Sequence, residues 1–264
     1  MNSLQIVSTS KPSNWIGNNT AIEARDVSKH FHIYEHRSSS LREHFVRTLT
    51  EGLPSEKQSY FCLENVSLSI REGETWSLIG RNGAGKTTLL RLMAGIYCPS
   101  SGVVVTHGRI AALIELSAGL HHELSGAENV FLYGSILGFS RNEISRRYNE
   151  IVEFAGIEDF MATPVKYYST GMKMRLGFAI ATAVEPDILL LDEIFAVGDA
   201  GFRERCIDRI HLFQNKGCTL VLATHDLEIA KNFSTKALWL DRGRVRMLDR
   251  AAYVIDVYKD SFAQ

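Results

Sequence analysis

The sequence predicts an α/β fold in which helices cover both faces of a largely parallel sheet. Two continuous apolar runs, Ile188–Leu191 and Cys218–Ala223, have the composition of strands buried on both faces. Alternation of Val66, Leu68 and Ile70 with serines is typical of a strand that has one solvent-facing side. With 264 residues and 45% hydrophobic content, the chain can form one large domain with a packed core.

A helical segment interrupts this pattern of strands between about residues 117 and 183. Ser140 and Glu143 form a capping-box pattern, and apolar residues follow it at helical spacing. We therefore expect a helical subdomain inserted into the sheet domain. Asp241–Arg244 predicts a turn between the last strands, and a final helix is expected over about 251–262.

The N-terminal residues 1–20 are rich in Ser, Asn and Thr and predict a flexible tail, so the ordered domain is expected to span 21–264. No stretch approaches the roughly 20 apolar residues that span a bilayer. Any membrane-spanning part is therefore expected on another chain.

Charge and cysteine content exclude several classes of function. A net charge of -1 provides no global attraction to nucleic acid or anionic lipid, so no nucleic-acid partner is expected. The four cysteines are widely spaced and form no C-x-x-C pattern, which argues against a zinc site and a disulfide framework. A reducing cytosol fits this cysteine usage best.

A glycine-rich loop lies between a predicted buried strand, Thr75–Ile79, and a predicted helix that starts at Thr88. Its sequence is Gly80-Arg81-Asn82-Gly83-Ala84-Gly85-Lys86-Thr87, which matches the phosphate-binding pattern G-x-x-x-x-G-K-[ST]. A plain glycine-rich turn is the alternative, but the strand before the loop and the helix after it favour a P-loop NTPase that binds a nucleotide triphosphate.

The loop predicts specific roles for its residues. Backbone N–H groups freed by the glycines surround the phosphates, and the helix N-terminus adds partial positive charge. Lys86 is expected to reach the β- and γ-phosphates of ATP, and the Thr87 hydroxyl to ligate Mg²⁺.

Carboxylates and a histidine follow two of the buried strands. Asp192 and Glu193 end the first apolar run, and His225 follows the second. Because parallel strands end at one edge of a sheet, these side chains are expected beside the phosphates. Asp192 would hold Mg²⁺ through its water shell, Glu193 would polarise the attacking water, and His225 would reach the γ-phosphate.

A further motif, Tyr168-Ser169-Thr170-Gly171-Met172, resembles the signature motif of ABC-type ATPases, and the resemblance covers nearly all of Ala21 to Asp260. Ser169 would cap a helix whose N-terminus is a second anion site. The resemblance implies a homodimer in which this motif of one subunit closes over the ATP held by the other. It also implies that the loop Val197-Gly198-Asp199 lines the subunit interface, with Asp199 as the contact.

Two departures from the commonest family pattern point to a subgroup. The signature reads Tyr-Ser-Thr-Gly-Met where Leu-Ser-Gly-Gly-Gln is common, and Glu115 stands where a glutamine usually contacts Mg²⁺. The signature, and the whole segment from Ala111 to Asn129 that contains Glu115, are similar to those of the ATPases of polysaccharide and teichoic acid exporters. A carboxylate at position 115 can still ligate a hard cation.

An insert over about residues 36–60 is the third departure. Ser40 and Glu43 form a capping-box pattern, and Leu41, Phe45 and Leu49 share one face, which predicts an amphipathic helix. That helix lies either on its own sheet or against a membrane partner. Before the insert, Phe31 stands where the family stacks an aromatic ring on adenine, with Tyr34 as the other candidate.

Together the residues and the resemblance predict the ATP-hydrolysing subunit of an ABC exporter. The resemblance implies a peripheral protein on the cytoplasmic face of the inner membrane. It would dock on a separate multi-span permease that exports a lipid-linked polysaccharide of the O-antigen, capsule or teichoic acid type. Because the chain ends at Gln264, we expect substrate choice to lie in the partner or in upstream enzymes. A soluble ABC-type ATPase acting on ribosomes or DNA, and a nucleotide switch without turnover, are the alternative functions.

Overall fold

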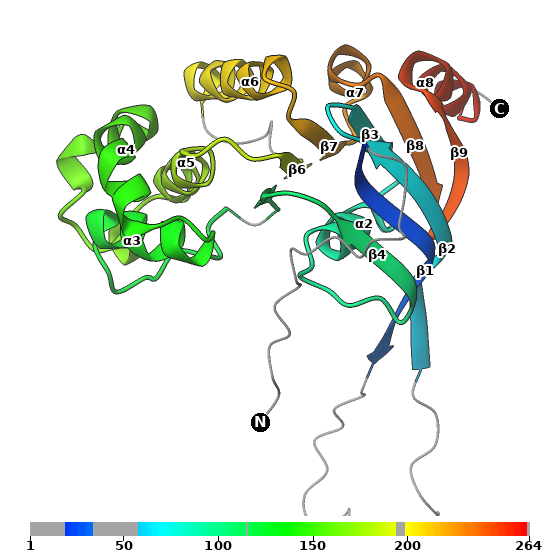
Figure 1. Cartoon of the computed structure of the whole chain (residues 1–264), viewed down its shortest axis with the longest axis horizontal. Coiled ribbons are helices and arrows are strands. Elements are labelled where there is room, and N and C mark those ends of the chain that lie inside the picture. The colour runs from blue at the N-terminus through cyan, green and yellow to red at the C-terminus, as the bar shows by residue number, and fades with distance from the viewer. Residues whose placement is uncertain (1–18, 34–57, 115, 194–198, 263–264) are drawn as a thin grey trace, which may run out of the picture.

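A computed structural model of the chain describes residues 19–33, 58–114, 116–193 and 199–262, and Figure 1 shows their arrangement. Several residues singled out above lie outside these ranges. They are Tyr34, Glu115, Val197, Gly198, residues 1–18 of the predicted tail, and the amphipathic helix predicted within the insert.

The larger sheet of the described chain has the strand order β5-β6-β7-β3-β8-β9. Its strands are β3 (Thr75–Ile79), β5 (Ile110–Leu113), β6 (Ile188–Asp192), β7 (Thr219–Ala223), β8 (Lys236–Asp241) and β9 (Arg244–Arg250). All neighbours are parallel except β8 and β9, which the predicted turn joins as an antiparallel pair. Every residue of β3 and β7, and all of β6 except its last, is buried, which confirms the interpretation of the apolar runs.

The smaller sheet is antiparallel, with the order β2-β1-β4. Its strands are β1 (Thr20–Ile33), β2 (Gln58–Arg71) and β4 (Ser101–Thr106). Strand β2 begins at Gln58, inside the range expected for the insert, because its pairing with β1 extends to Ile33. The alternation in β2 is confirmed, since its apolar residues are buried and the serines between them are exposed.

Helices cover both faces of the larger sheet (Figure 1). They are α2 (Lys86–Met93), α6 (Ala200–Asn215), α7 (Leu227–Phe233) and α8 (Ala251–Asp260). Alternate residues of the strands pack on opposite faces of the sheet. Leu190 and Val221 pack in one cluster with Leu89 of α2. Their neighbours Leu189 and Leu220 pack in another cluster with Phe202 of α6. Helices α7 and α8 lie side by side, with α7 packed on β3 and α8 on β8 and β9 (Figure 1). The phosphate-loop helix is thus enclosed between the two sheets.

Helices occupy the stretch between β5 and β6, beside the sheets in Figure 1. They are α3 (Gly126–Ile136), α4 (Arg141–Ala155) and α5 (Thr170–Ala181), with 3-10 turns at Glu158–Phe160 and Val165–Tyr167. The predicted capping box is present at α4, where the Glu143 N–H donates to Ser140 Oγ at 3.3 Å and the Ser140 N–H to Glu143 Oε2 at 2.8 Å. None of the described helices is long and apolar enough to cross a membrane.

Candidate nucleotide site

The glycine-rich loop is held between β8 and β2 by close backbone contacts. Gly80 has φ 146°, and a Cβ there would lie 2.2 Å from the Leu240 carbonyl oxygen. Gly85 has φ 105°, and a Cβ there would lie 2.8 Å from the Cys62 carbonyl oxygen. Gly83 also has a positive φ but meets nothing within 4 Å. Side chains at positions 80 and 85 would therefore displace the loop, since L residues rarely adopt these angles and no space is left.

Helix α2 begins without a capping side chain. Its N-cap is Gly85 in a left-handed conformation, and no acidic residue lies in the first turn. The first N–H groups of a helix have no partner within the helix and need an outside acceptor. Together with the helix dipole, this end of α2 suits an anion such as a phosphate.

Lys86 is buried beneath the loop. Its Nζ donates to the carbonyl oxygens of Gly80 at 2.7 Å and Arg81 at 3.2 Å, and the residue is 6% exposed. Burial lowers the pKa of the Lys86 ammonium, whereas Glu193 and Asp192 raise it. The loop's carbonyl side is therefore occupied by Lys86, and its N–H side is left for a ligand.

Asp192 ends β6 beside this loop and is hydrogen-bonded to the side chain of Thr87. Burial raises the pKa of the Asp192 carboxyl; the bond from Thr87 lowers that pKa, and the neighbouring charge of Glu193 raises it. The net shift is upward. The ionised carboxylate is thus placed where a cation would stabilise it.

Glu193 and His225 lie in contact after neighbouring strands. Glu193 Oε1 is 3.1 Å from His225 Nδ1, and both side chains are exposed. The Glu193 N–H donates to the Ala223 carbonyl at 3.0 Å, which ties the residue to the end of β7. Glu193 has φ 50°, in the left-handed region that non-glycine residues rarely adopt. Backbone strain of this kind is concentrated at functional sites.

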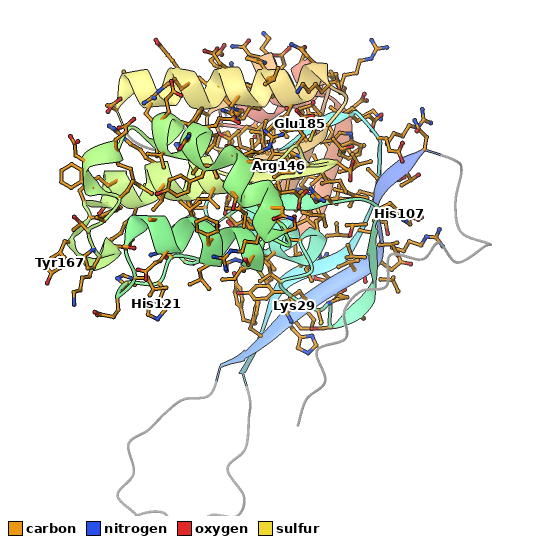
Figure 2. All side chains as sticks on the ribbon, turned by 60° about the vertical axis from the view of Figure 1, so that its left-hand side comes forward. Lys29, His107, His121, Arg146, Tyr167 and Glu185 are labelled. Atoms are coloured by element: carbon orange, nitrogen blue, oxygen red, sulfur yellow. The ribbon has the colours of Figure 1, made fainter. Side chains whose placement is uncertain are left out.

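The corner formed by Ser169–Met172 starts helix α5. Ser169 Oγ accepts a bond from the Met172 N–H at 3.2 Å, which confirms Ser169 as the cap. Ser169 and Thr170 are exposed, and Gly171 and Met172 are half-buried. Tyr167, two residues before the corner, lies on the helical side of the molecule in Figure 2, whereas Lys29 lies on the smaller sheet. The corner thus presents a helix N-terminus at the surface.

Asp199 has two partners within its own chain that the sequence analysis missed. Its Oδ1 accepts from the Phe202 N–H at 2.9 Å and caps α6, and its Oδ2 forms an ion pair with Arg175 of α5. The bond from Phe202, and then the charge of Arg175, lower the pKa of the Asp199 carboxyl. An N-cap pattern in the sequence predicts the first contact; no local pattern predicts the second.

Phe31 lies on the face of β1 that looks toward the loop. Lys29, two residues before it, is paired with Leu63, whose side chain contacts the position of Gly85. The Phe31 ring meets the Tyr97 ring edge-on at 5.5 Å, and Lys29 Nζ lies 5.1 Å from its centre. The contact of Lys29 Nζ with the ring places Phe31 on the same face of β1 as Lys29, although the register with β2 shifts between Lys29 and His30. That face is the one turned toward the loop.

Cys62 is a further residue at the site that the sequence analysis did not identify. Its Sγ lies 3.0 Å from Thr88 Oγ1, at the start of α2. The contact bridges 26 positions of sequence, and nothing in the local pattern around Cys62 indicates it.

Three features together define a P-loop site for a nucleoside triphosphate. They are a buried lysine under a glycine-rich loop, an uncapped helix N-terminus, and carboxylates at the end of β6, which β7 separates from β3. Comparison with known proteins narrows this class, because the ABC transporter family profile matches residues 63–196. The chain is 37% identical to the O-antigen export system ATP-binding protein RfbB of Klebsiella pneumoniae, over 92% of this chain and 98% of that protein. It is 38% identical to the teichoic acids export ATP-binding protein TagH of Bacillus anthracis, over 92% of this chain and 43% of that one.

Solved structures agree on the fold. An ATP-binding subunit of an ABC transporter matches with a TM-score of 0.71 at 23% identity, over 91% of this chain and 94% of that one. A dimeric ATP-binding cassette bound to ADP and Pi matches with a TM-score of 0.68 at 23% identity, over 87% and 98%. The chain therefore belongs to the ABC transporter family and carries its ATPase domain, which confirms the predicted resemblance to ABC-type ATPases.

The raised pKa of Asp192 predicts a pH-dependent effect of Asp192→Asn on stability without nucleotide or Mg²⁺. Because the folded-state pKa lies above the unfolded-state value, ionised Asp192 costs stability at neutral pH and nothing below about pH 4. The variant should therefore unfold at higher urea than the wild type at pH 7, and this advantage should fade as the pH falls toward about 4. Exposed Asp208→Asn is the control and should change little at either pH. Equal or lower stability of Asp192→Asn at pH 7 would contradict the assignment.

Proposed function

We propose that this chain hydrolyses ATP as the cytosolic subunit of an ABC exporter for a lipid-linked surface polysaccharide. The proposed substrate class rests on the similarity, along 92% of the chain, to a protein named for O-antigen export. A relative named for teichoic acid export supports the same class. The geometry of the nucleotide site supports hydrolysis.

ATP would be bound by the loop Gly80–Thr87 and by Thr88. The first-turn N–H groups of α2 would donate hydrogen bonds to phosphate oxygens, and Lys86 would exchange its bonds to loop carbonyls for bonds to the β- and γ-phosphates. Adenine would stack on Phe31, which already lies on the same face as the loop.

Mg²⁺ would be held by Thr87 and Asp192. Hydroxyl and carboxylate oxygens suit this hard cation. Burial raises the pKa of the Asp192 carboxyl even though Lys86 and Arg91 lower it, so a bound cation would further stabilise the ionised form. No group of three or more His, Cys, Asp or Glu residues within the described ranges is arranged to hold a metal alone, and Mg²⁺ commonly takes its remaining ligands from phosphates and water. Glu115 would be a further ligand. When held by Thr87 and Asp192, Mg²⁺ would supply positive charge that offsets the charge of the phosphates.

Hydrolysis would depend on the pair Glu193 and His225. Glu193 would orient the attacking water and accept its proton. His225, in contact with the same carboxylate, would hold Glu193 in place and donate to the γ-phosphate. Phosphoryl transfer needs positioning and charge neutralisation more than covalent chemistry, so this arrangement suffices without a nucleophilic side chain.

The site would be completed by a second copy of the chain. The corner at Ser169, Thr170, Gly171 and Met172, of which the first two residues are exposed, would close over the ATP held by the other subunit, with Asp199 near the interface. A similar fold is dimeric in its solved ADP-bound form, which supports this arrangement. The homodimer would dock on a separate permease, as a peripheral protein on the cytoplasmic face of the membrane.

Glu193→Gln should retain ATP binding but slow hydrolysis by about 10²–10⁴-fold, since a general base contributes that much. ATP would then persist and hold the two subunits together, so light scattering should show a dimer with Mg-ATP. Lys86→Ala is the contrasting variant and should bind ATP weakly and remain monomeric. A monomeric Glu193→Gln at saturating Mg-ATP would refute the shared site.

Phe31→Ala should weaken ATP binding by about tenfold, because stacking of a base on an aromatic ring is worth about 1–3 kcal/mol. Phe61→Ala is the matched control: Phe61 is paired with His30 on the opposite face of the same two strands and is exposed. Its affinity for ATP should stay near that of the wild type. Equal losses in both variants, measured by calorimetry, would remove Phe31 from the adenine site.

Export itself is tested in the native cell, in a strain whose only copy of this protein is the Glu193→Gln variant. Polysaccharide should disappear from the surface, while its lipid-linked form accumulates inside, since synthesis does not need this ATPase. Gel analysis of surface and internal glycan separates the two pools. A normal surface polysaccharide in this strain would refute the exporter function while leaving ATP hydrolysis in place.

A further inference from the structure

We infer that Arg175 is a positioning residue for the ATP-dependent dimer: it holds Asp199 beside the corner at Ser169–Met172, so that both meet the second copy as one preformed surface. The inference rests on the proposed function, in which a second copy completes the nucleotide site. Arg175 lies in α5 and Asp199 directly precedes α6, and their side chains form an ion pair across 24 positions of sequence. In Figure 1 the start of α6 lies above α5.

Both carboxylate oxygens of Asp199 have a partner within the chain. Oδ1 accepts from the Phe202 N–H at 2.9 Å, and Oδ2 pairs with Arg175. The cap alone would leave one oxygen without a partner, whereas bonds to both oxygens restrict rotation of the carboxylate, although the side chain is 59% exposed. Because an ionised carboxylate offers about four acceptor sites, Asp199 can still accept a bond from a donor on the second copy.

Arg175 is itself held in place. Its side chain is only 25% exposed, and its Cζ lies 5.6 Å from the centre of the buried Phe202 ring. In α5, Arg175 follows Gly171 by four positions and Met172 by three, so the three residues share a face of the helix. The ion pair therefore joins the start of α6 to the face of α5 that leads to the corner.

The contribution of this ion pair to fold stability is expected to be small. An exposed ion pair gains little free energy, because water and salt screen it. Helices α5 and α6 are already joined by the buried rings of Phe178 and Phe202, which meet edge-on at 5.9 Å. What the pair adds is order in an exposed carboxylate. Without it, that ordering would cost free energy when the two copies associate.

Arg205 provides a matched control on the same aromatic ring. Its Cζ lies 5.4 Å from the centre of the Phe202 ring, and the side chain is exposed. The bond from Phe202 and then the charges of Arg175 and Arg205 lower the pKa of the Asp199 carboxyl. Either arginine is thus a cation near Asp199, but of these two only Arg175 is bonded to it within the described ranges.

A dilution series followed by light scattering tests the inference on the full chain, in the Glu193→Gln background with saturating Mg-ATP. Arg175→Ala should weaken dimerisation by about tenfold, because each of the two subunits would lose about threefold in ordering Asp199. Calorimetry should show little change in the affinity of the single subunit for ADP. Arg175→Lys keeps a cation and should restore most of the dimer, and Arg205→Ala should change dimerisation less than about twofold.

Asp199→Asn tests whether Arg175 acts through Asp199. Asparagine can still cap α6 but carries no charge for the ion pair. By itself it should weaken the dimer at least as much as Arg175→Ala, which keeps the test decisive if Arg175→Ala does not fold. Adding Arg175→Ala to Asp199→Asn should then weaken the dimer by less than about twofold. A tenfold loss that persists in the Asp199→Asn background would overturn the inference.

Failure of this inference is distinguishable from failure of the proposed function. If Glu193→Gln alone is monomeric with Mg-ATP, the shared site is refuted, and the role of Arg175 is refuted with it. If Glu193→Gln is dimeric and Arg175→Ala dimerises equally well, only the positioning role is refuted. Equal losses in Arg175→Ala and Arg205→Ala would assign the effect to positive charge near Asp199, and would overturn the role of the bond.

Discussion

The nucleotide site depends on the parallel pairing of β6 and β3 with the strand between them, β7. Backbone hydrogen bonds hold the ends of these strands in register, with Asp192 opposite Ala223 and Leu78 opposite the same residue on the other side. The phosphate loop directly follows β3, Asp192 ends β6 with Glu193 next to it, and His225 lies two residues after the end of β7. Their separation in space is therefore set by strand spacing, about 4.8 Å, and not by flexible side chains.

Without a ligand, the charged and polar groups at the ends of these strands do not fully compensate one another. Lys86 is buried and bonded to loop carbonyls, while Asp192 is half-buried beside Glu193. One end of the site thus has unmet N–H groups and the other has carboxylates that repel one another. A magnesium-bound triphosphate would complement both, because its oxygens would accept from the N–H groups and its cation would neutralise the carboxylates. Satisfying these groups would contribute to the free energy of ligand binding.

Close packing of the smaller sheet on the loop adds a second constraint. Leu63 and the Cys62 carbonyl occupy the space that a side chain at Gly85 would need, and Cys62 Sγ contacts Thr88. The same strands position Phe31 on the nucleotide side. Two sheets of different type thus meet at the glycines, which leaves the loop little freedom to move without displacing β2 or β8.

Much of the site was predictable because its determinants are local. The loop pattern, the apolar runs before Asp192 and His225, the Ser169 cap and the Ser140 capping box each depend on a few neighbouring residues, whose propensities act over one turn or one strand. Tertiary structure alone decided the Arg175 pair with Asp199 and the contact of Cys62 with Thr88. These contacts join segments brought together by strand order, which hydrophobic periodicity does not encode, because many topologies bury the same apolar faces.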